Sequence, residues 1–262
     1  MPDMPLDLDQ LEYEGYTIVH GFMDHARTQR IRDHMDSLLP PIGASREDPK
    51  RWHHVLRHPI PGAIMAELLN DPTLLALAAQ SLKTRELRLL EQVLIRSDPR
   101  PPPHVPLGWH IDFAFFPRQY QALPRQTYFH MVHCLNTVAP GGAAFMVVPG
   151  SHQLTYAISA QMETAEELSR LKRDPVGLTG IEVKKGIEIC PEEGDLLVFN
   201  PMALHSGSGN ATDQSRYVYF TSFFDTSASE LWQAMRETKY RDGFSRELHT
   251  ELPEDLRPLL EW

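Results

Sequence analysis

Six short runs rich in β-branched and aromatic residues, all after residue 87, constrain the fold of the chain more than any other feature. Glycine, proline and asparagine separate the runs, and each run is too short for an amphipathic helix. Short strands at this spacing are typical of an antiparallel sandwich or barrel with helices packed outside. The predicted strands are residues 88–95, 127–135, 144–148, 186–190, 195–200 and 217–224.

The rest of the chain is predicted to be mainly helical. Residues 22–39 place apolar side chains on one helix face, with Asp24 as the N-cap. Residues 62–82 are interpreted as two short helices, the second beginning at Asp71, and residues 159–174 as a helical insertion between strands. Because no linker separates these segments, we expect one domain over residues 1–262. It comprises a helical part to about 86, a β core over about 87–225 and a helical extension over about 226–262.

The charge balance argues against several kinds of partner. The chain has 25 Lys and Arg against 35 Asp and Glu, a formal net charge of −10, which disfavours nucleic acid and anionic membranes. No apolar run approaches the roughly 20 residues of a membrane span. The acidic start lacks the pattern of a signal peptide, and Cys134 and Cys190 are expected to be buried free thiols. We therefore expect a cytoplasmic protein. Nothing in the sequence indicates its oligomeric state.

A metal site is predicted from three residues. His110 and Asp112 are two positions apart, so on an extended segment their side chains face the same side. His205, which follows the predicted strand at 195–200 in a segment of small residues, is the best candidate for a third ligand. Two imidazoles and one carboxylate form the facial triad of non-heme Fe(II) oxygenases, which leaves positions open for a co-substrate and O₂. Zinc would accept the same ligands in a tetrahedral site.

Arg216 distinguishes between these metals. It lies eleven residues after His205, at the start of the apolar run 217–224. A guanidinium forms two parallel, charge-assisted hydrogen bonds to a carboxylate, and a buried one needs an anionic partner. An arginine at this place therefore favours an iron site whose co-substrate is a dicarboxylate.

These residues, together with two further segments, resemble the phytanoyl-CoA dioxygenase family of Fe(II)/2-oxoglutarate oxygenases. Residues 142–152, GAAFMVVPGSH, are similar to that family's NGALxVxPGSH segment. Residues 205–210, HSGSGN, are similar to the HGSGxN that follows its distal ligand. Order and spacing agree over residues 88–224, whereas the N-terminal part agrees only in its helical character.

The resemblance implies a double-stranded β-helix, the jelly-roll barrel of cupins, with the metal at its open mouth. It implies His110, Asp112 and His205 as iron ligands and Arg216 as the partner of the distal carboxylate of 2-oxoglutarate. Some members use a serine two residues after the distal histidine for the same carboxylate. Gly207 occupies that position here, so the second contact stays unassigned. Halogenating relatives replace the carboxylate ligand by Gly or Ala, and the intact Asp112 therefore favours hydroxylation or another two-electron oxidation.

Further residues are expected near the site. Gln92 is predicted to contact 2-oxoglutarate or substrate, because several relatives place a polar residue on that strand. Trp109 and Phe113 flank the motif and are candidates for an aromatic pocket wall. On strand 127–135, Tyr128 and His130 share one face with residues 132 and 134, and the sequence does not tell which face lines the pocket. The proline-rich segment 97–109 is either a lid or a connection, and its prolines exclude a central strand.

The function expected from these observations is an Fe(II)/2-oxoglutarate-dependent dioxygenase that uses O₂ to oxidise a small molecule, with succinate and CO₂ as co-products. A natural-product intermediate or an amino-acid derivative is the expected substrate, because a chain of net charge −10 suits an acyl-CoA poorly. Two alternatives are a non-catalytic cupin-like metal-binding protein and a zinc hydrolase. Arg216 argues against both, since neither needs a guanidinium beside the metal.

Overall fold

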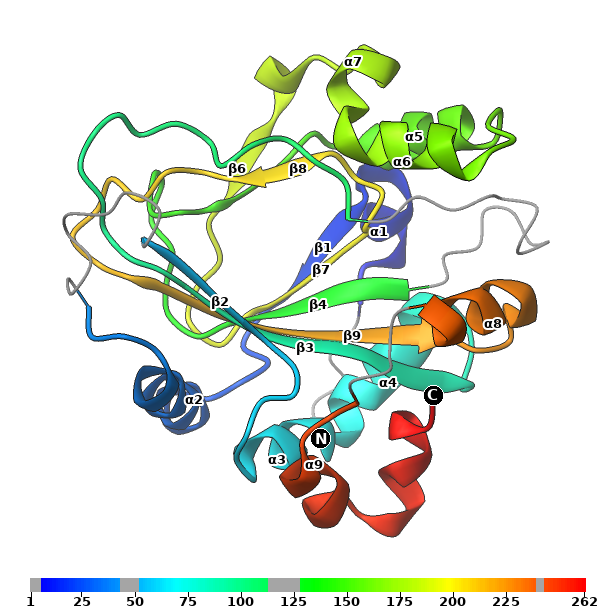
Figure 1. Ribbon diagram of the computed structural model, residues 1–262. Coiled ribbons are helices and arrows are strands. Elements are labelled where there is room, and N and C mark those ends of the chain that lie inside the picture. The colour runs from blue at the N-terminus through cyan, green and yellow to red at the C-terminus, as the bar shows by residue number, and fades with distance from the viewer. Residues whose placement is uncertain (1–5, 43–51, 113–127, 239–242) are drawn as a thin grey trace.

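Two antiparallel sheets that face each other form the centre of the molecule (Figure 1). The computed structural model describes residues 6–42, 52–112, 128–238 and 243–262. The large sheet has the strand order β1-β7-β4-β9-β3-β2, and the small one β6-β5-β8. Their strands are β1 (Tyr16–Val19), β2 (His53–Arg57), β3 (Leu87–Ser97), β4 (Tyr128–Cys134), β5 (Phe145–Val147), β6 (Ile187–Ile189), β7 (Leu196–Phe199), β8 (His205–Gly207) and β9 (Arg216–Asp225).

The predicted mainly β fold with flanking helices is confirmed, and each of the six predicted runs contains a strand. Three strands were not predicted. β8 has only three residues, while β1 and β2 lie in the segment expected to be helical and form the two edges of the large sheet. The description of residues 1–86 as a helical part is therefore wrong in this respect, because two of its segments extend the sheet.

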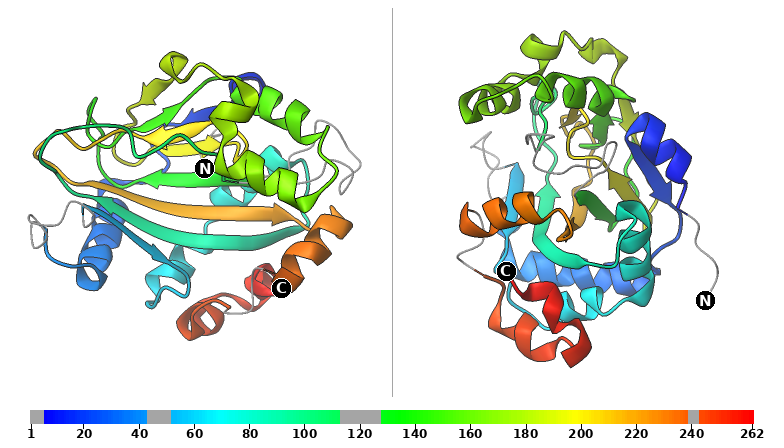
Figure 2. Two further views of the ribbon diagram at one scale, coloured as in Figure 1. Left: turned by 45° about the horizontal axis from the view of Figure 1, so that its top comes forward. Right: turned by 90° about the vertical axis from the view of Figure 1, so that its right-hand side faces the viewer.

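Helices cover the outer face of the large sheet and one end of the small sheet (Figures 1 and 2). The carboxylates of Asp24 and Asp71 cap α2 and α4 by accepting backbone N–H groups, so these helices begin where the sequence predicts. The insertion at 159–174 contains α6. The helices are α1 (Leu8–Glu14), α2 (His25–Leu38), α3 (Ile64–Leu69), α4 (Pro72–Leu82), α5 (Ser151–Ser159), α6 (Ala165–Arg173), α7 (Pro175–Thr179), α8 (Ser229–Thr238) and α9 (Arg246–Glu251), with 3₁₀ turns at Val183–Lys185 and Glu254–Leu260.

Each face of the large sheet packs against its own apolar core. The outer face joins α2, α3 and α4 in the larger core, which contains Met35, Leu69 and Leu94. The inner face meets the small sheet in a second core, which contains Val132, Phe145, Leu197 and Val218. Side chains alternate along β4, so the inner face receives residues 128, 130, 132 and 134. The face of this strand that lines the interior is thereby determined.

A β-bulge interrupts the pairing of β3 with β9. Leu89 lies opposite Phe223 and Glu91 lies opposite Ser222, so Leu90 is an extra residue. Because side chains alternate along a strand, one extra residue exchanges the faces of all later positions. Glu91 therefore turns to the inner face and Gln92 to the outer face.

The proline-rich segment after β3 runs along β8. Backbone hydrogen bonds join the N–H of Leu107 to the carbonyl of Gly207, and His110 and His205 bond each other in both directions. No strand forms in residues 98–109, as the prolines predict. No helix in the described part of the chain has the length and apolar character needed to cross a membrane. Cys134 is buried as expected, whereas Cys190 is exposed, contrary to expectation.

Candidate metal centre and co-substrate pocket

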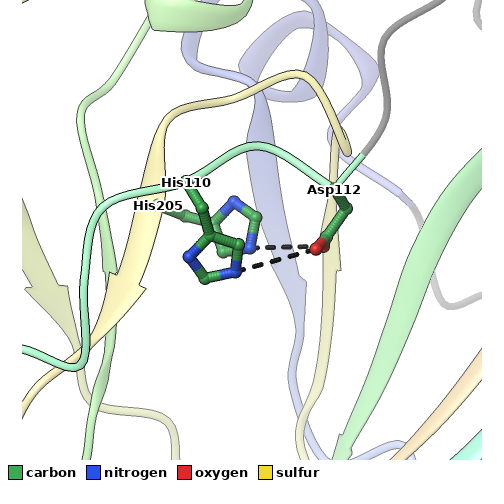
Figure 3. Close-up of side chains that lie close together, drawn as sticks. All are labelled: His110, Asp112 and His205. Carbon is green, nitrogen blue, oxygen red and sulfur yellow. Dashed lines mark ion pairs between the residues drawn. The ribbon is translucent and has the colours of Figure 1, made fainter. Parts of the chain in front are cut away.

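His110, Asp112 and His205 converge on one point between the two sheets (Figure 3). One ligand atom from each of the three lies within 4.8 Å of the other two. Nε2 of His205 is 3.2 Å from Oδ2 of Asp112, and Nε2 of His110 is 3.7 Å from Oδ1 of the same carboxylate. Among the described residues, these three form the single cluster of His, Cys, Asp or Glu with the spacing of a metal site.

The backbone fixes the relative positions of the three side chains. The two-way hydrogen bonding of His110 with His205 holds the segment before Asp112 against β8. The N–H of Asp112 donates to the carbonyl of Pro201 at 2.9 Å, in the turn that leads to His205. The pairing of two chain segments therefore brings the His-x-Asp motif to the distal histidine.

The hydrogen bonds of the two histidines leave Nε2 of each ring free for a metal. Nδ1 of His110 lies 2.9 Å from the carbonyl of Gly108, and Nδ1 of His205 lies 2.8 Å from that of Ala203. A carbonyl oxygen can only accept, so each Nδ1 carries the proton and each Nε2 presents its lone pair to the centre. This is the tautomer that a metal-ligating histidine requires.

The electrostatics of the site keep the carboxylate ionised. Burial alone would raise the pKa of Asp112, but the neighbouring His205 and His130 more than offset this and hold that pKa well below its ordinary value. Burial lowers the pKa of His110, with a further contribution from His205. The pKa of His205 is raised, because the attraction of Asp112 exceeds the effect of burial. An ionised carboxylate beside imidazole lone pairs is a donor set suited to a divalent cation.

A cavity of about 550 Å³ contains the three residues and also Arg216. Arg216 lies opposite Ser97, and Ser97 lies opposite His53, so these three residues form a row across β9, β3 and β2. No described residue forms an ion pair or hydrogen bond with the Arg216 guanidinium, and burial lowers its pKa. The structure thus brings the predicted guanidinium into the cavity of the predicted ligands and leaves it available to an anion.

Two of the other predicted site residues, Gln92 and Trp109, do not line the cavity. The side-chain amide of Gln92 donates to the hydroxyl of Tyr219 at 2.6 Å, on the outer face of the sheet. The prediction that Gln92 contacts 2-oxoglutarate is therefore wrong, and the bulge at Leu90 is the reason. Trp109 points away from the cavity into an apolar cluster with Ile111, because residues next to His110 face the opposite side. Phe113 lies outside the described residues.

Tyr128 and His130 do line the cavity, together with residues that sequence reasoning missed. Glu91 was missed because the bulge that turns it inward leaves no mark in the sequence. His53 was missed because its strand is five residues long and begins with two polar side chains. Its Nδ1 lies 2.8 Å from the hydroxyl of Ser97, and burial, followed by the charge of Arg216, lowers the pKa of His53 to about 4.

Comparison with known proteins agrees with this geometry. The sequence pattern of the phytanoyl-CoA dioxygenase (PhyH) family matches residues 11–218. The chain belongs to this family. Its members are 2-oxoglutarate-dependent non-heme iron oxygenases, with Fe(II), 2-oxoglutarate and O₂ as their cofactor set. Among curated proteins, no sequence matches this one.

Solved structures of similar fold share little sequence with this PhyH-family protein. EvdO2 from Micromonospora carbonacea var. aurantiaca, in complex with 2-oxoglutarate, is 17% identical with a TM-score of 0.57, over 84% of this chain and 89% of that one. HygX from Streptomyces hygroscopicus, with nickel and 2-oxoglutarate, is 17% identical with a TM-score of 0.58, over 85% and 88%. The epimerase SnoN from nogalamycin biosynthesis, with Fe³⁺, α-ketoglutarate and nogalamycin RO, is 18% identical with a TM-score of 0.60, over 84% and 82%. At these identities the likeness establishes the fold.

Proposed function

We propose that this PhyH-family enzyme hydroxylates a small-molecule metabolite, or oxidises it by two electrons in another way, and releases succinate and CO₂. The observation that carries the proposal is that His110, Asp112 and His205 share one cavity with Arg216, whose guanidinium pairs with none of the described residues. A metal-binding protein without turnover, or a zinc hydrolase, gives no reason for a guanidinium within the same cavity.

In this proposal the three clustered side chains hold the iron. The fixed Nδ1–H tautomers give two neutral nitrogen donors, and Asp112 supplies the negative charge. Bound Fe(II) would supply the activation of O₂, coupled to decarboxylation of 2-oxoglutarate. Because these three residues line the cavity, iron held by them would be accessible to O₂ and 2-oxoglutarate from it.

Arg216 binds the distal carboxylate of 2-oxoglutarate through two parallel N–H donors, which orients the co-substrate along the cavity. His53, in the same cross-strand row, is the second contact that the sequence left unassigned. If the Ser97 hydroxyl donates to Nδ1 of His53, the Nε2–H of that neutral ring becomes a donor toward the carboxylate. Gly207 cannot serve, and a side chain at that position would come within 3.0 Å of Leu107.

The remaining cavity fits a mixed, mostly apolar small molecule. Phe145, Phe199 and Phe220 provide apolar wall, and Tyr128 and Glu91 provide polar groups. Two of the structures of similar fold contain small molecules, hygromycin B in HygX and nogalamycin RO in SnoN from nogalamycin biosynthesis. We therefore propose a natural-product intermediate or an amino-acid derivative as the substrate.

Two measurements test this function. Anaerobic addition of Fe(II) and 2-oxoglutarate should produce a weak visible charge-transfer band that neither gives alone, since it requires both on one metal. A panel of small metabolites should then contain compounds that raise succinate formation above the uncoupled background. Absence of the band at saturating iron and 2-oxoglutarate would refute the proposed site.

The intact Asp112 favours hydroxylation or another two-electron oxidation over halogenation. In Asp112→Gly, hydroxylation should be lost, because the vacated position becomes available to chloride or water. An unchanged hydroxylation rate in this variant would remove Asp112 from the ligand set.

A further inference from the structure

His130 lies directly beside the proposed iron ligand Asp112 and is almost completely buried, at 4% exposure. Its Nε2 is 3.0 Å from Oδ2 of Asp112. The approach is short but poorly directed, so this nitrogen has no hydrogen-bond acceptor of good geometry among the residues that the structure describes. A buried polar nitrogen without a partner is costly, and the nearest group that can relieve the cost is the Asp112 carboxylate.

A row of polar side chains fixes the other edge of the His130 ring. His130 lies opposite Ser222 on β9, and Ser222 lies opposite Glu91 on β3. Nδ1 of His130 is 2.8 Å from the Ser222 hydroxyl and 3.3 Å from Oε1 of Glu91, and the same hydroxyl is 3.3 Å from that oxygen. Arg57 on β2 continues the row outward with an ion pair to Glu91 at 3.2 Å.

Packing leaves the imidazole little freedom to turn away. The ring of Phe199 lies 4.8 Å from that of His130 and the ring of Tyr128 lies 5.2 Å from it, centroid to centroid, with Phe220 at 5.8 Å. Polar contacts at Nδ1 and aromatic contacts on the faces together aim Nε2 at Asp112. The bulge at Leu90 contributes, because without it Glu91 would not lie on this face.

We propose that His130 is a positioning residue, which donates its Nε2–H to one oxygen of Asp112 and so turns the other oxygen toward the metal. A carboxylate can only accept, so the bond to Asp112 requires the proton on Nε2 of His130. Residues that orient a metal ligand in this way typically contribute ten- to a hundredfold to metal affinity or activity. The proposal rests on Asp112 being a ligand, as proposed above.

The test compares two buried histidines of the same strand. His130→Phe keeps the ring and its volume but removes the donor, and His130→Gln restores an N–H that reaches the Nε2 position. His133→Phe is the matched control, because His133 is equally buried but faces the outer side, where its Nε2 bonds the hydroxyl of Thr221 at 2.9 Å. Each metal-free variant is first examined by circular dichroism and thermal unfolding. Co(II), which is stable in air, then replaces Fe(II) in a titration followed through its visible absorption bands.

We expect His130→Phe to raise the Co(II) dissociation constant about ten- to a hundredfold and to change the absorption bands. His130→Gln should recover most of the affinity, and His133→Phe should bind like the wild type even if it is less stable. In turnover assays His130→Phe should lower kcat and leave the apparent 2-oxoglutarate constant unchanged, since Arg216 is untouched.

Three outcomes would overturn the proposal. Wild-type Co(II) affinity in a folded His130→Phe would show that the contact does not orient the ligand. Equal loss in His130→Phe and His130→Gln would show that the ring matters only for packing. Loss of all binding, as expected for His110→Ala, would make His130 a ligand itself. If His130→Phe does not fold, His130→Gln and Ser222→Ala carry the test, the latter with a smaller loss of affinity expected. The proposed ligand set is tested independently of His130, and it would be refuted if His110→Ala and His205→Ala still bind Co(II).

Discussion

The inner and outer faces of the large sheet are made by the same strands, and both bury polar groups, but they use them differently. On the outer face, Gln92 bonds Tyr219 and His133 bonds Thr221 beneath a layer of helices. On the inner face, Arg216 and the metal residues open into a cavity. The outer face bonds these side chains to each other beneath the helices, whereas the inner face directs its charged groups into a cavity. The difference teaches that burial alone does not identify a functional residue and that its place on the cavity side of the sheet does.

The largest expected effect is on the inner face alone. His110→Ala and His205→Ala should each abolish Fe(II)-dependent turnover, because two ligands do not define the facial site. The fold should survive, since each variant loses one polar side chain at the wall of a cavity. Succinate production at saturating iron measures activity, and circular dichroism measures folding. Near-wild-type turnover in either variant would exclude that residue as a ligand.

A truncation on the outer face should give the opposite result. Leu94 is fully buried in the larger core, and Leu94→Ala should lower the free energy of unfolding by about 2–5 kcal/mol. Affinity for Co(II) should be unchanged under conditions where the variant is folded. Urea titration gives the stability. A parallel loss of metal affinity would mean that the two faces of the sheet are coupled.

Arg216→Lys separates co-substrate binding from metal binding on the inner face, because it keeps the charge and loses the forked geometry. Hydrogen bonds to charged groups contribute about 1.5–3 kcal/mol each, so the apparent 2-oxoglutarate constant should rise about ten- to a hundredfold. Pyruvate, which lacks the distal carboxylate, should respond little. Metal affinity without co-substrate should not change. Equal losses for both keto acids would make Arg216 structural.

The smallest expected effect is on the pH dependence of stability, and it comes from a histidine of the outer face. Burial lowers the pKa of His133 to about 3, below the ordinary value of about 6.5 that it has in the unfolded chain. Between these values the unfolded state binds the extra proton, so stability is complete above about pH 6.5 and falls as the pH drops. The loss should approach about 1.4 kcal/mol per pH unit for this residue. His133→Phe should show a shallower decline between pH 6.5 and 5, measured by urea unfolding. Identical slopes of stability against pH in the wild type and in His133→Phe would refute the lowered pKa of His133.

The sequence predicts the strands with several apolar residues and the two capped helices, because their patterns are local. It also predicts that His110, Asp112, His205 and Arg216 belong together, which the shared cavity supports. β8 could not be predicted, since its three residues acquire strand geometry only by pairing with β5. The orientation of His130 depends on which face of β4 meets the small sheet. That choice is made by packing between distant segments.

The bulge marks the one place where β3 tolerates a change in its number of residues. Deleting Leu90 would close the bulge and leave Glu91 opposite Ser222, so every later side chain would keep its face. A residue inserted after Glu91 would instead move the following side chains to the other face, so that Gln92, Leu94 and Arg96 would enter the cavity and Val93 would press against helices. Single substitutions in β3 act on one face at a time. An insertion in its regular part would change both faces at once, so the number of residues there is constrained more tightly than their kind.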